Sequence, residues 1–176
     1  IWDYNLRKLI LTIKGHNDGV KLVKFMPGSD QYLLSASDED QTIVLWDLVT
    51  GKRIQTYKHE NSFWPEGLGF TGADATGKPG AYFYAGHQFG IEKWETNTGK
   101  LIFRWNADSL INDGKHHWIH CYEYSDELKS SFFVEGNDVY QLHHETGKFE
   151  KIYTAASSIS SLKFNRAQKI IALGCA

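Results

Sequence analysis

The stretch DQTIVLWDLVTGKRI, Asp40 to Ile54, contains a short alternating segment that ends on a Trp-Asp pair. A Thr-Gly-Lys turn follows, and a second alternating segment begins directly after it. Alternation on both sides of a glycine-containing turn is typical of two antiparallel strands in a hairpin. Whether this hairpin occurs once or is one copy of a repeated unit decides the architecture of the whole chain.

The turn is repeated at a constant spacing. Thr-Gly-Lys begins at Thr50, Thr98 and Thr146, 48 residues apart each time. Strand-like segments precede each copy (TIVLWD, GIEKWE, DVYQLHH) and follow it (KRIQTY, KLIFRW, KFEKIY). An upstream pair of segments also recurs, as in VKLVKF before YLLSAS and SISSLKF before KIIALG. The repeated unit is therefore four short strands of roughly 40 to 50 residues, with very little helix expected.

These residues resemble the WD-repeat family of β-propellers, with the best match from Gly15-His16 through VKLVKFMPGSDQYLLSAS to TIVLWD. The resemblance implies an all-β propeller of four-stranded antiparallel WD-repeat blades packed radially. It divides the chain into the end of one blade (1–14), a WD-repeat blade (15–58), two degenerate blades (59–106 and 107–155) and the first strands of another (156–176), all in one propeller domain. Such propellers commonly close with more blades, so we expect an incomplete ring here, completed by further blades or by a second chain.

The family also implies a hydrogen-bonded chain inside a blade. The matching positions are His16, Ser35 or Ser37, Asp40 and Trp46, with Asp38 as a rival to Asp40. A buried Trp N–H needs an acceptor, and a hydroxyl and an imidazole can relay that demand to a carboxylate. A His, a Ser and an Asp also occur in hydrolases, but a nucleophile needs an exposed oxygen and an oxyanion site. We therefore expect a structural role.

The next two blades depart from the motif. The second keeps His59 and Trp94 but has no Asp in its turn GHQFG, and the third has Leu142 at the Trp position. The sequence predicts that these two blades are held by packing alone.

The loop HENSFWPEG, residues 59–67, suggests a partner-binding surface. Exposed aromatic residues dominate interface hot spots, although the sequence leaves open whether this loop's rings are exposed or tucked against the blade edge. Neighbouring turns add polar residues that suit the rim of an interface with a peptide or protein. The predicted partner-binding residues are Phe63, Trp64, Phe89, His87, Gln88, Asp38 and Glu39.

Three stretches raise the alternative of an enzyme. GADATGKP, residues 72–79, nearly matches a phosphate-binding loop, but Pro79 replaces the magnesium-binding hydroxyl and a strand follows instead of a helix. KHHWIHC gathers His116, His117, His120 and Cys121, which zinc could use. TGKLIFRW is similar to a turn of quinoprotein propellers. We expect no catalytic residues, no cofactor, no metal and no small-molecule substrate, and keep a quinoprotein-like or metal-dependent enzyme as an alternative.

Composition limits the remaining classes. The 19 basic and 21 acidic residues give a net charge of −2, without the global footprint of a nucleic-acid-binding protein. A lysine group at Lys8, Lys14, Lys21 and Lys24 nevertheless keeps a scaffold that contacts RNA, as in RNA processing or ribosome assembly, as an alternative. Neither Trp-Asp pair is followed by the basic residue of ubiquitin-ligase docking sequences.

Two cysteines in no metal-ligand spacing and the lack of a long apolar run favour an intracellular protein, cytoplasmic or nuclear, with no membrane insertion. The leading interpretation is a non-catalytic WD-repeat scaffold. It would mediate protein–protein interactions within a larger multi-subunit complex.

Overall fold

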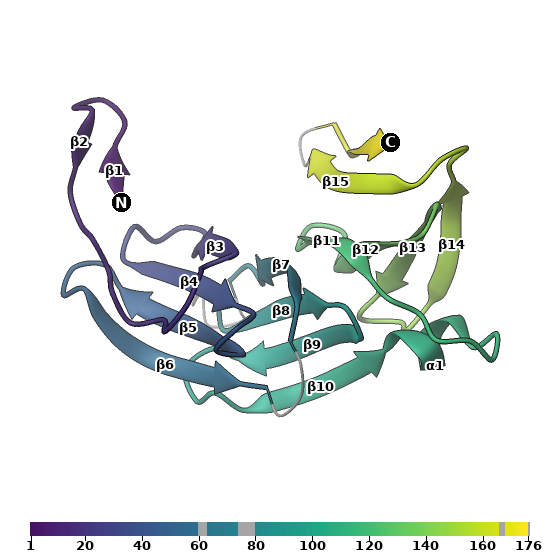
Figure 1. The fold of residues 1–176 in the computed structure, drawn as a ribbon, viewed down its shortest axis with the longest axis horizontal. Coiled ribbons are helices and arrows are strands. Elements are labelled where there is room, and N and C mark those ends of the chain that lie inside the picture. The colour runs from purple at the N-terminus through teal and green to yellow at the C-terminus, as the bar shows by residue number, and fades with distance from the viewer. Residues whose placement is uncertain (60–62, 74–79, 166–167, 176) are drawn as a thin grey trace.

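The computed structural model describes residues 1–59, 63–73, 80–165 and 168–175. Three four-stranded antiparallel sheets follow one another along the chain, with a strand pair before and another after them (Figure 1). The first pair is β1 (Trp2–Asp3) with β2 (Lys8–Leu9), and the last is β15 (Ile159–Asn165) with β16 (Ile170–Cys175). In the sheets the strands lie in sequence order, as a meander of hairpins does.

The first blade consists of β3 (Leu22–Phe25), β4 (Tyr32–Ser37), β5 (Thr42–Asp47) and β6 (Lys52–Lys58). The second blade consists of β7 (Pro65–Phe70), β8 (Tyr82–His87), β9 (Gly90–Glu95) and β10 (Leu101–Asn106). The third blade consists of β11 (His120–Ser125), β12 (Ser130–Glu135), β13 (Asp138–His143) and β14 (Phe149–Thr154).

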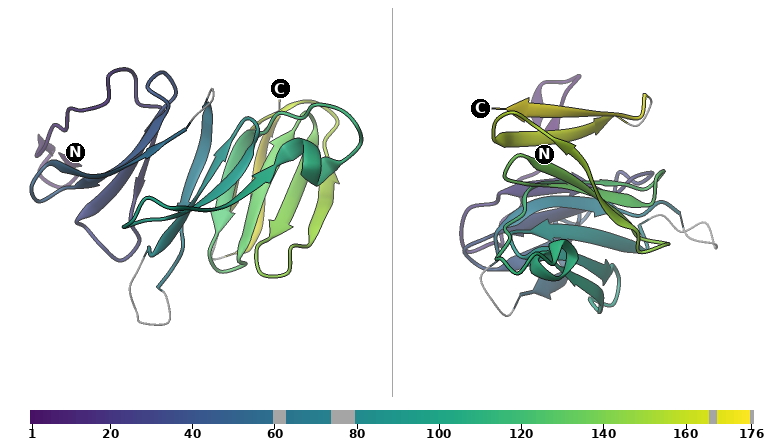
Figure 2. Two further views of the ribbon diagram at one scale, coloured as in Figure 1. Left: turned by 90° about the horizontal axis from the view of Figure 1, so that it is seen from below. Right: turned by 90° about the vertical axis from the view of Figure 1, so that its right-hand side faces the viewer.

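The blades are arranged as an open arc. Strand β7 contacts β3 on one side and β11 on the other, and β11 also contacts β15. These first strands lie along the inside of the arc, whereas β6, β10 and β14 lie along its outside (Figure 1). Viewed from below, the sheets stand side by side in a row (Figure 2). The predicted fold class, an incomplete β-propeller, is therefore confirmed.

Within the part of the chain that the structure describes, one short helix interrupts the all-β pattern. Helix α1 (Ala107–Ile111) follows β10, and the side chain of Asn106 caps it by accepting a hydrogen bond from the backbone N–H of Asp108. It lies in the connection between the second and third blades. No helix in the described ranges has the length and apolar character needed to cross a bilayer.

The repeated Thr-Gly-Lys sequence forms the same turn in all three blades. Gly51, Gly99 and Gly147 have φ angles of 68°, 72° and 69°, a left-handed conformation that glycine adopts without steric cost. In each copy the threonine hydroxyl accepts a hydrogen bond from the lysine backbone N–H, at 3.2 to 3.4 Å. The constant spacing in the sequence is thus the spacing of the hairpin that joins the third and fourth strands.

The core is divided among the contacts between blades. Middle strands are buried on both faces, so successive residues contribute to different clusters. Phe83 packs between the first and second blades, whereas Tyr84 packs between the second and third. Likewise Phe133 faces the second blade and Phe132 faces β15 and β16. Each blade therefore depends on its neighbours for its stability.

The second and third blades approach closely because glycine faces tyrosine. A Cβ atom added at Gly86 would overlap the ring of Tyr122, and one added at Gly69 would overlap the Cβ of Tyr124. The two tyrosines are each 3% exposed and fill the space that the glycines leave. Small residues on β7 and β8 thus set the distance between these blades.

Candidate functional site

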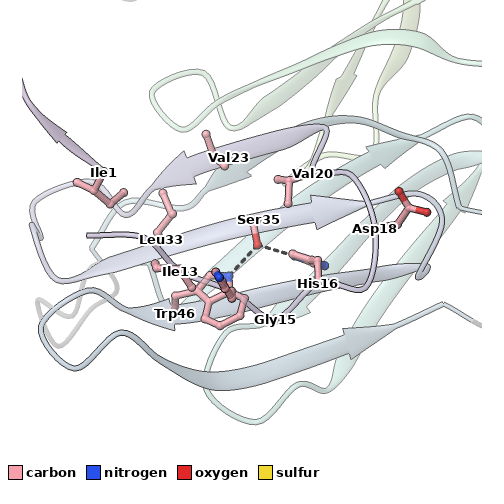
Figure 3. Close-up of a pocket in the computed structure, with 11 residues that line it drawn as sticks. Ile1, Ile13, Gly15, His16, Asp18, Val20, Val23, Leu33, Ser35 and Trp46 are labelled. Atoms are coloured by element: carbon pink, nitrogen blue, oxygen red, sulfur yellow. Dashed lines mark hydrogen bonds between the residues drawn. The ribbon is translucent and has the colours of Figure 1, made fainter. Parts of the chain in front are cut away.

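The first blade contains a directional chain of hydrogen bonds (Figure 3). The indole N–H of Trp46 on β5 donates to the Ser35 hydroxyl on β4 at 2.7 Å. Ser35 Oγ lies 2.6 Å from His16 Nε2, and His16 Nδ1 lies 2.8 Å from Asp40 Oδ2. The consistent assignment is that Ser35 donates to the imidazole and that the imidazole donates to the carboxylate. Every polar atom in this chain has a partner, so the network ties the β4–β5 hairpin to the segment before β3.

The geometry distinguishes between the residues that the sequence left as alternatives. Ser35, not Ser37, contacts Trp46 and His16. The hydroxyl of Ser37 is buried without a hydrogen-bond partner among the described residues. Asp40 contacts His16, whereas Asp38 forms an ion pair with Lys21 at 2.6 Å.

This chain of side chains has no accessible nucleophile. Ser35 is 4% exposed, and its oxygen already accepts the Trp46 N–H. Burial opposes the charge of Asp40, but hydrogen bonds from Thr42, His16 and the backbone of Asn17 outweigh it and lower the pKa of this carboxyl. A cavity of about 520 Å³ lies beside the chain, with an apolar lining that includes Ile13, Val20, Val23 and Leu33 (Figure 3).

The expectation that the second blade is held by packing alone is wrong. Glu92 on β9 is fully buried and accepts a hydrogen bond from the Trp94 indole at 2.9 Å. Arg104 on β10 contacts the same carboxylate through Nε at 2.8 Å and Nη2 at 2.7 Å. His59 Nδ1 lies 3.3 Å away and His87 Nε2 lies 3.7 Å away. A carboxylate two residues before the Trp, on the same strand, thus takes the place of the missing turn Asp.

The ionisation of this second network follows from its surroundings. Burial opposes the charge of Glu92, but His87, His59 and Arg104 outweigh it and lower the pKa of the carboxyl to about 2. Burial also lowers the pKa of His59 to about 4, despite the carboxylate beside it. At neutral pH the network therefore holds a carboxylate, a guanidinium and a neutral imidazole.

The third blade also contains a polar network, which corrects the same expectation. The Tyr122 hydroxyl lies 2.6 Å from Ser131 Oγ, which lies 2.8 Å from His144 Nε2. The His144 ring stacks on Tyr84 of the second blade at a centroid distance of 4.0 Å. Burial lowers the pKa of His144 to about 3, so its imidazole is neutral at pH 7. The hydrogen bonds lie within the third blade, and the stacked His144 ring connects them to the second blade.

The predicted partner-binding loop separates into a buried ring and an exposed ring. Phe63 is only 2% exposed and stacks on His59 at 3.7 Å, so it belongs to the core and cannot act as an interface anchor. Trp64 is 53% exposed, and the Lys21 ammonium lies 3.5 Å from the centroid of its ring. Only Trp64 of this pair is available to a partner.

Of the five remaining residues of that prediction, Phe89 and Glu39 are exposed, Gln88 and Asp38 are half-buried, and His87 is buried. Phe89, in the turn between β8 and β9, is 40% exposed. His87 is buried beside Glu92 and is therefore excluded from a contact surface. Asp38 is bonded to Lys21, while Glu39 is exposed in the β4–β5 turn. Gln88 holds the surface together, because its backbone and side chain bond to the backbones of Trp64 and Ile119.

Sequence reasoning assigned none of three further residues to this surface, although it named His120 as a possible zinc ligand. Trp118 is 59% exposed and precedes β11. His120 is the first residue of β11, and Glu66 lies on β7. Together with residues already named they line a cavity of about 440 Å³. We call it the aromatic cavity, lined by Trp64, Glu66, Gln88, Phe89, Trp118 and His120. The sequence signal was Trp118 in KHHWIHC, a stretch whose histidines and cysteine indicated a possible zinc site instead.

Two histidines of KHHWIHC, His116 and His117, contact carboxylates. His116 Nδ1 lies 2.9 Å from Asp108, and His117 lies between Asp113 at 2.7 Å and Glu135 at 3.3 Å. Burial opposes the charge of His117, but its hydrogen bond to Asp113 and its pairing with Glu135 outweigh it and raise the pKa of the imidazole. Within the described ranges no three His, Cys, Asp or Glu side chains are arranged to hold a metal ion.

Two further sequence features are the phosphate-loop-like stretch and the lysine group. Residues 74–79 of the phosphate-loop-like stretch lie outside the described residues. In the lysine group, Lys21 is engaged by Asp38 and Trp64.

The fold is that of an incomplete β-propeller, and the first-blade network resembles the one expected in WD-repeat blades. No protein-family model matches the chain. The chain is 35% identical over 109 residues to nuclear distribution protein PAC1 of Arthroderma otae, covering 58% of this chain and 23% of the relative. It is 26% identical over 117 residues to the guanine nucleotide-binding protein subunit beta of Zea mays, covering 65% of this chain and 30% of the relative.

Solved structures agree on the fold. The β-propeller domain of Cps50 (Swd1) from Myceliophteria thermophila superposes with a TM-score of 0.77 at 16% identity, covering 99% of this chain and 54% of that one. U3-55K superposes with a TM-score of 0.65 at 13% identity, covering 85% of this chain and 44% of that one. The chain thus spans about half the length of these structures and less than a third of the sequence relatives. The resemblance to WD-repeat β-propellers is confirmed.

Proposed function

We propose that this chain is a non-catalytic scaffold segment that presents the aromatic cavity to a protein partner within a larger assembly. The observation that carries the proposal is the exposure of three large rings, Trp64, Phe89 and Trp118, around one cavity. Aromatic residues are enriched at interface hot spots, and exposing them in a group is costly unless they are covered part of the time.

The surface is also rigid enough to recognise a partner. The Gln88 side-chain oxygen accepts the Trp64 backbone N–H at 2.6 Å, and its backbone oxygen accepts the Ile119 N–H at 2.9 Å. Three separate connections, before β7, between β8 and β9, and before β11, are therefore fixed relative to one another. A surface held in its binding geometry loses little conformational entropy on association.

The alternatives have weaker support. A hydrolase would need an exposed serine oxygen, and that of Ser35 is buried and already bonded. An RNA scaffold would need free basic side chains along a surface, but Lys21 is committed to Asp38 and Trp64.

The unpaired cysteines Cys121 and Cys175 support an intracellular location for the assembly.

Affinity purification of the intact protein with mass spectrometry tests the proposal. We expect Trp118→Ala and Trp64→Ala to lose a subset of the co-purifying proteins while the melting temperature stays close to that of the wild type. Val49→Ala is the matched control, because Val49 is also an exposed apolar residue, at 79% exposure. It lies in the β5–β6 turn, at the opposite end of its sheet from the β4–β5 turn. An unchanged set of partners in both tryptophan variants would refute the use of this surface.

A further inference from the structure

The aromatic cavity contains one feature that a purely apolar contact does not require, a carboxylate. Glu66 lies on β7 at an irregularity between Pro65 and Gly67, where the pairing with β8 shifts register. Cys121 lies at the matching irregularity of β11, with a φ angle of 59°. The Cys121 backbone N–H donates to Glu66 Oε2 at 3.1 Å. Paired bulges in two adjacent blades thus place this carboxylate at the cavity and hold it there.

The charge of Glu66 is only partly compensated. Burial raises the pKa of this carboxyl, and Lys21 opposes that effect only through its field. The Lys21 ammonium itself pairs with Asp38 at 2.6 Å and does not line the cavity. No basic side chain in the described ranges forms an ion pair with Glu66. A partly desolvated carboxylate beside a cavity favours a ligand that brings positive charge.

The three rings favour the same kind of ligand. The face of an aromatic ring carries partial negative charge and attracts an ammonium or guanidinium group, most strongly in tryptophan. Trp64 already demonstrates this preference, because the Lys21 ammonium lies 3.5 Å from its ring centroid. Two tryptophans and a phenylalanine around one cavity of about 440 Å³ leave room for a single extended side chain.

We propose that the aromatic cavity binds the cationic side chain, lysine, methylated lysine or arginine, of an extended peptide in the partner. The ligand's charge lies against the three rings, and Glu66 supplies the opposite charge. This inference rests on the proposed function and specifies the chemistry of its partner. A neutral apolar side chain would cover the rings but leave the carboxylate without compensation, and an anion would be repelled by it.

The test uses the intact protein labelled with ¹⁵N in its tryptophans. The probes are the N-acetyl methylamides of trimethyllysine, lysine and arginine, with that of norleucine as the neutral match in shape. We expect saturable shifts of the Trp64 and Trp118 indole signals with at least one cationic probe. Norleucine should bind about fivefold or more weakly, the range of a partly desolvated cation–π contact. Equal binding of norleucine, or no saturable shift up to the solubility limit of every cationic probe, would overturn the inference.

Glu66→Gln isolates the role of the charge. The amide oxygen can still accept the Cys121 N–H, so the bulge is preserved while the negative charge is lost. We expect about a tenfold loss of affinity for the cationic probe and no change for norleucine. Glu150→Gln, a carboxylate on β14 that contacts Lys148, is the control and should bind as the wild type does. Unchanged cation affinity in Glu66→Gln, with an unchanged melting temperature, would refute the assignment of the carboxylate.

The two proposals fail in different ways. If Trp118→Ala loses partners but Glu66→Gln keeps both partners and cation affinity, the surface is an interface and the cationic ligand is refuted. If neither tryptophan variant loses a partner, the proposed function itself is refuted.

Discussion

Replacing Glu92 by alanine should be among the most damaging single changes in the second blade. The carboxylate is fully buried and is shared by the Trp94 indole, the Arg104 guanidinium and the ring of His59. Its removal leaves a buried indole N–H without an acceptor and a guanidinium without its counter-charge. The variant therefore tests whether this blade depends on a polar network or on packing alone.

The expected magnitude follows from the separate contacts. An unsatisfied buried donor costs about 1–3 kcal/mol of the free energy of unfolding. The Arg104 contact adds less than a fully buried ion pair would, because 49% of the arginine side chain is exposed and solvent screens it. Together with the lost packing we expect about 2–4 kcal/mol, somewhat below the roughly 3–5 kcal/mol typical of breaking a fully buried pair. Glu92→Gln keeps an acceptor for Trp94, so it should cost about 1–2 kcal/mol.

The same network predicts sensitivity to acid. The pKa of Glu92 is lowered to about 2 from 4.5, so its contribution to stability is present above pH 4.5 and is lost as the pH falls toward 2. His59 acts in the same direction. Its pKa in the folded protein, about 4, lies below the unfolded value of 6.5, so the unfolded chain takes up the proton at a higher pH than the folded chain does. Stability should rise with pH across this range, and Glu92→Gln should remove the lower part of that rise.

Urea denaturation of the intact protein, followed by tryptophan fluorescence between pH 3 and pH 7, measures both effects. Glu150→Ala, which removes a carboxylate from the exposed edge strand β14, provides the control and should change stability by less than about 0.5 kcal/mol. A loss below about 1 kcal/mol for Glu92→Ala at pH 7 would contradict the importance of the network. An acid profile of Glu92→Gln identical to that of the wild type would contradict the assigned ionisation.

Three further predictions concern the first blade, the contact between the second and third blades, and the connection before β11. Trp46→Ala should lower the stability of the first blade by about 3–5 kcal/mol in the same urea assay, and a shift below about 1 kcal/mol would show that its hydrogen-bonded chain is dispensable. Gly86→Ala should cost about 1–3 kcal/mol, because the added methyl group overlaps the Tyr122 ring, and a melting temperature equal to that of the wild type would contradict this close packing. The raised pKa of His117 means that its contribution is fully present below pH 6.5 and is lost as the pH rises through the raised value. The melting temperature should therefore fall with rising pH in the wild type and fall less in His117→Gln, and parallel profiles would refute the role of the Asp113 contact.

The sequence alone predicted the architecture because that information is local and repeated. Each Thr-Gly-Lys turn needs a glycine with positive φ, and the 48-residue spacing shows the same hairpin three times. Alternation around the turns indicates strands without reference to tertiary contacts. The resemblance also gave the positions of the first-blade chain at His16 and Trp46, but it left Ser35 or Ser37 and Asp40 or Asp38 open until the contacts were known.

Tertiary structure alone decided what each ring and carboxylate does. Alternation shows that neighbouring residues face opposite sides, but only the packing of adjacent blades determines that Phe63 is buried and Trp64 is exposed. Glu92 meets Arg104 of β10, His87 at the end of β8 and His59, which follows the last strand of the first blade, so the strand pattern around Glu92 does not reveal this set of partners. The aromatic cavity likewise forms where three connections meet. Two of its rings, Trp64 and Trp118, are 54 residues apart in the sequence. Turns are set by local backbone preference, whereas burial and cavities are set by which surfaces meet when the blades pack.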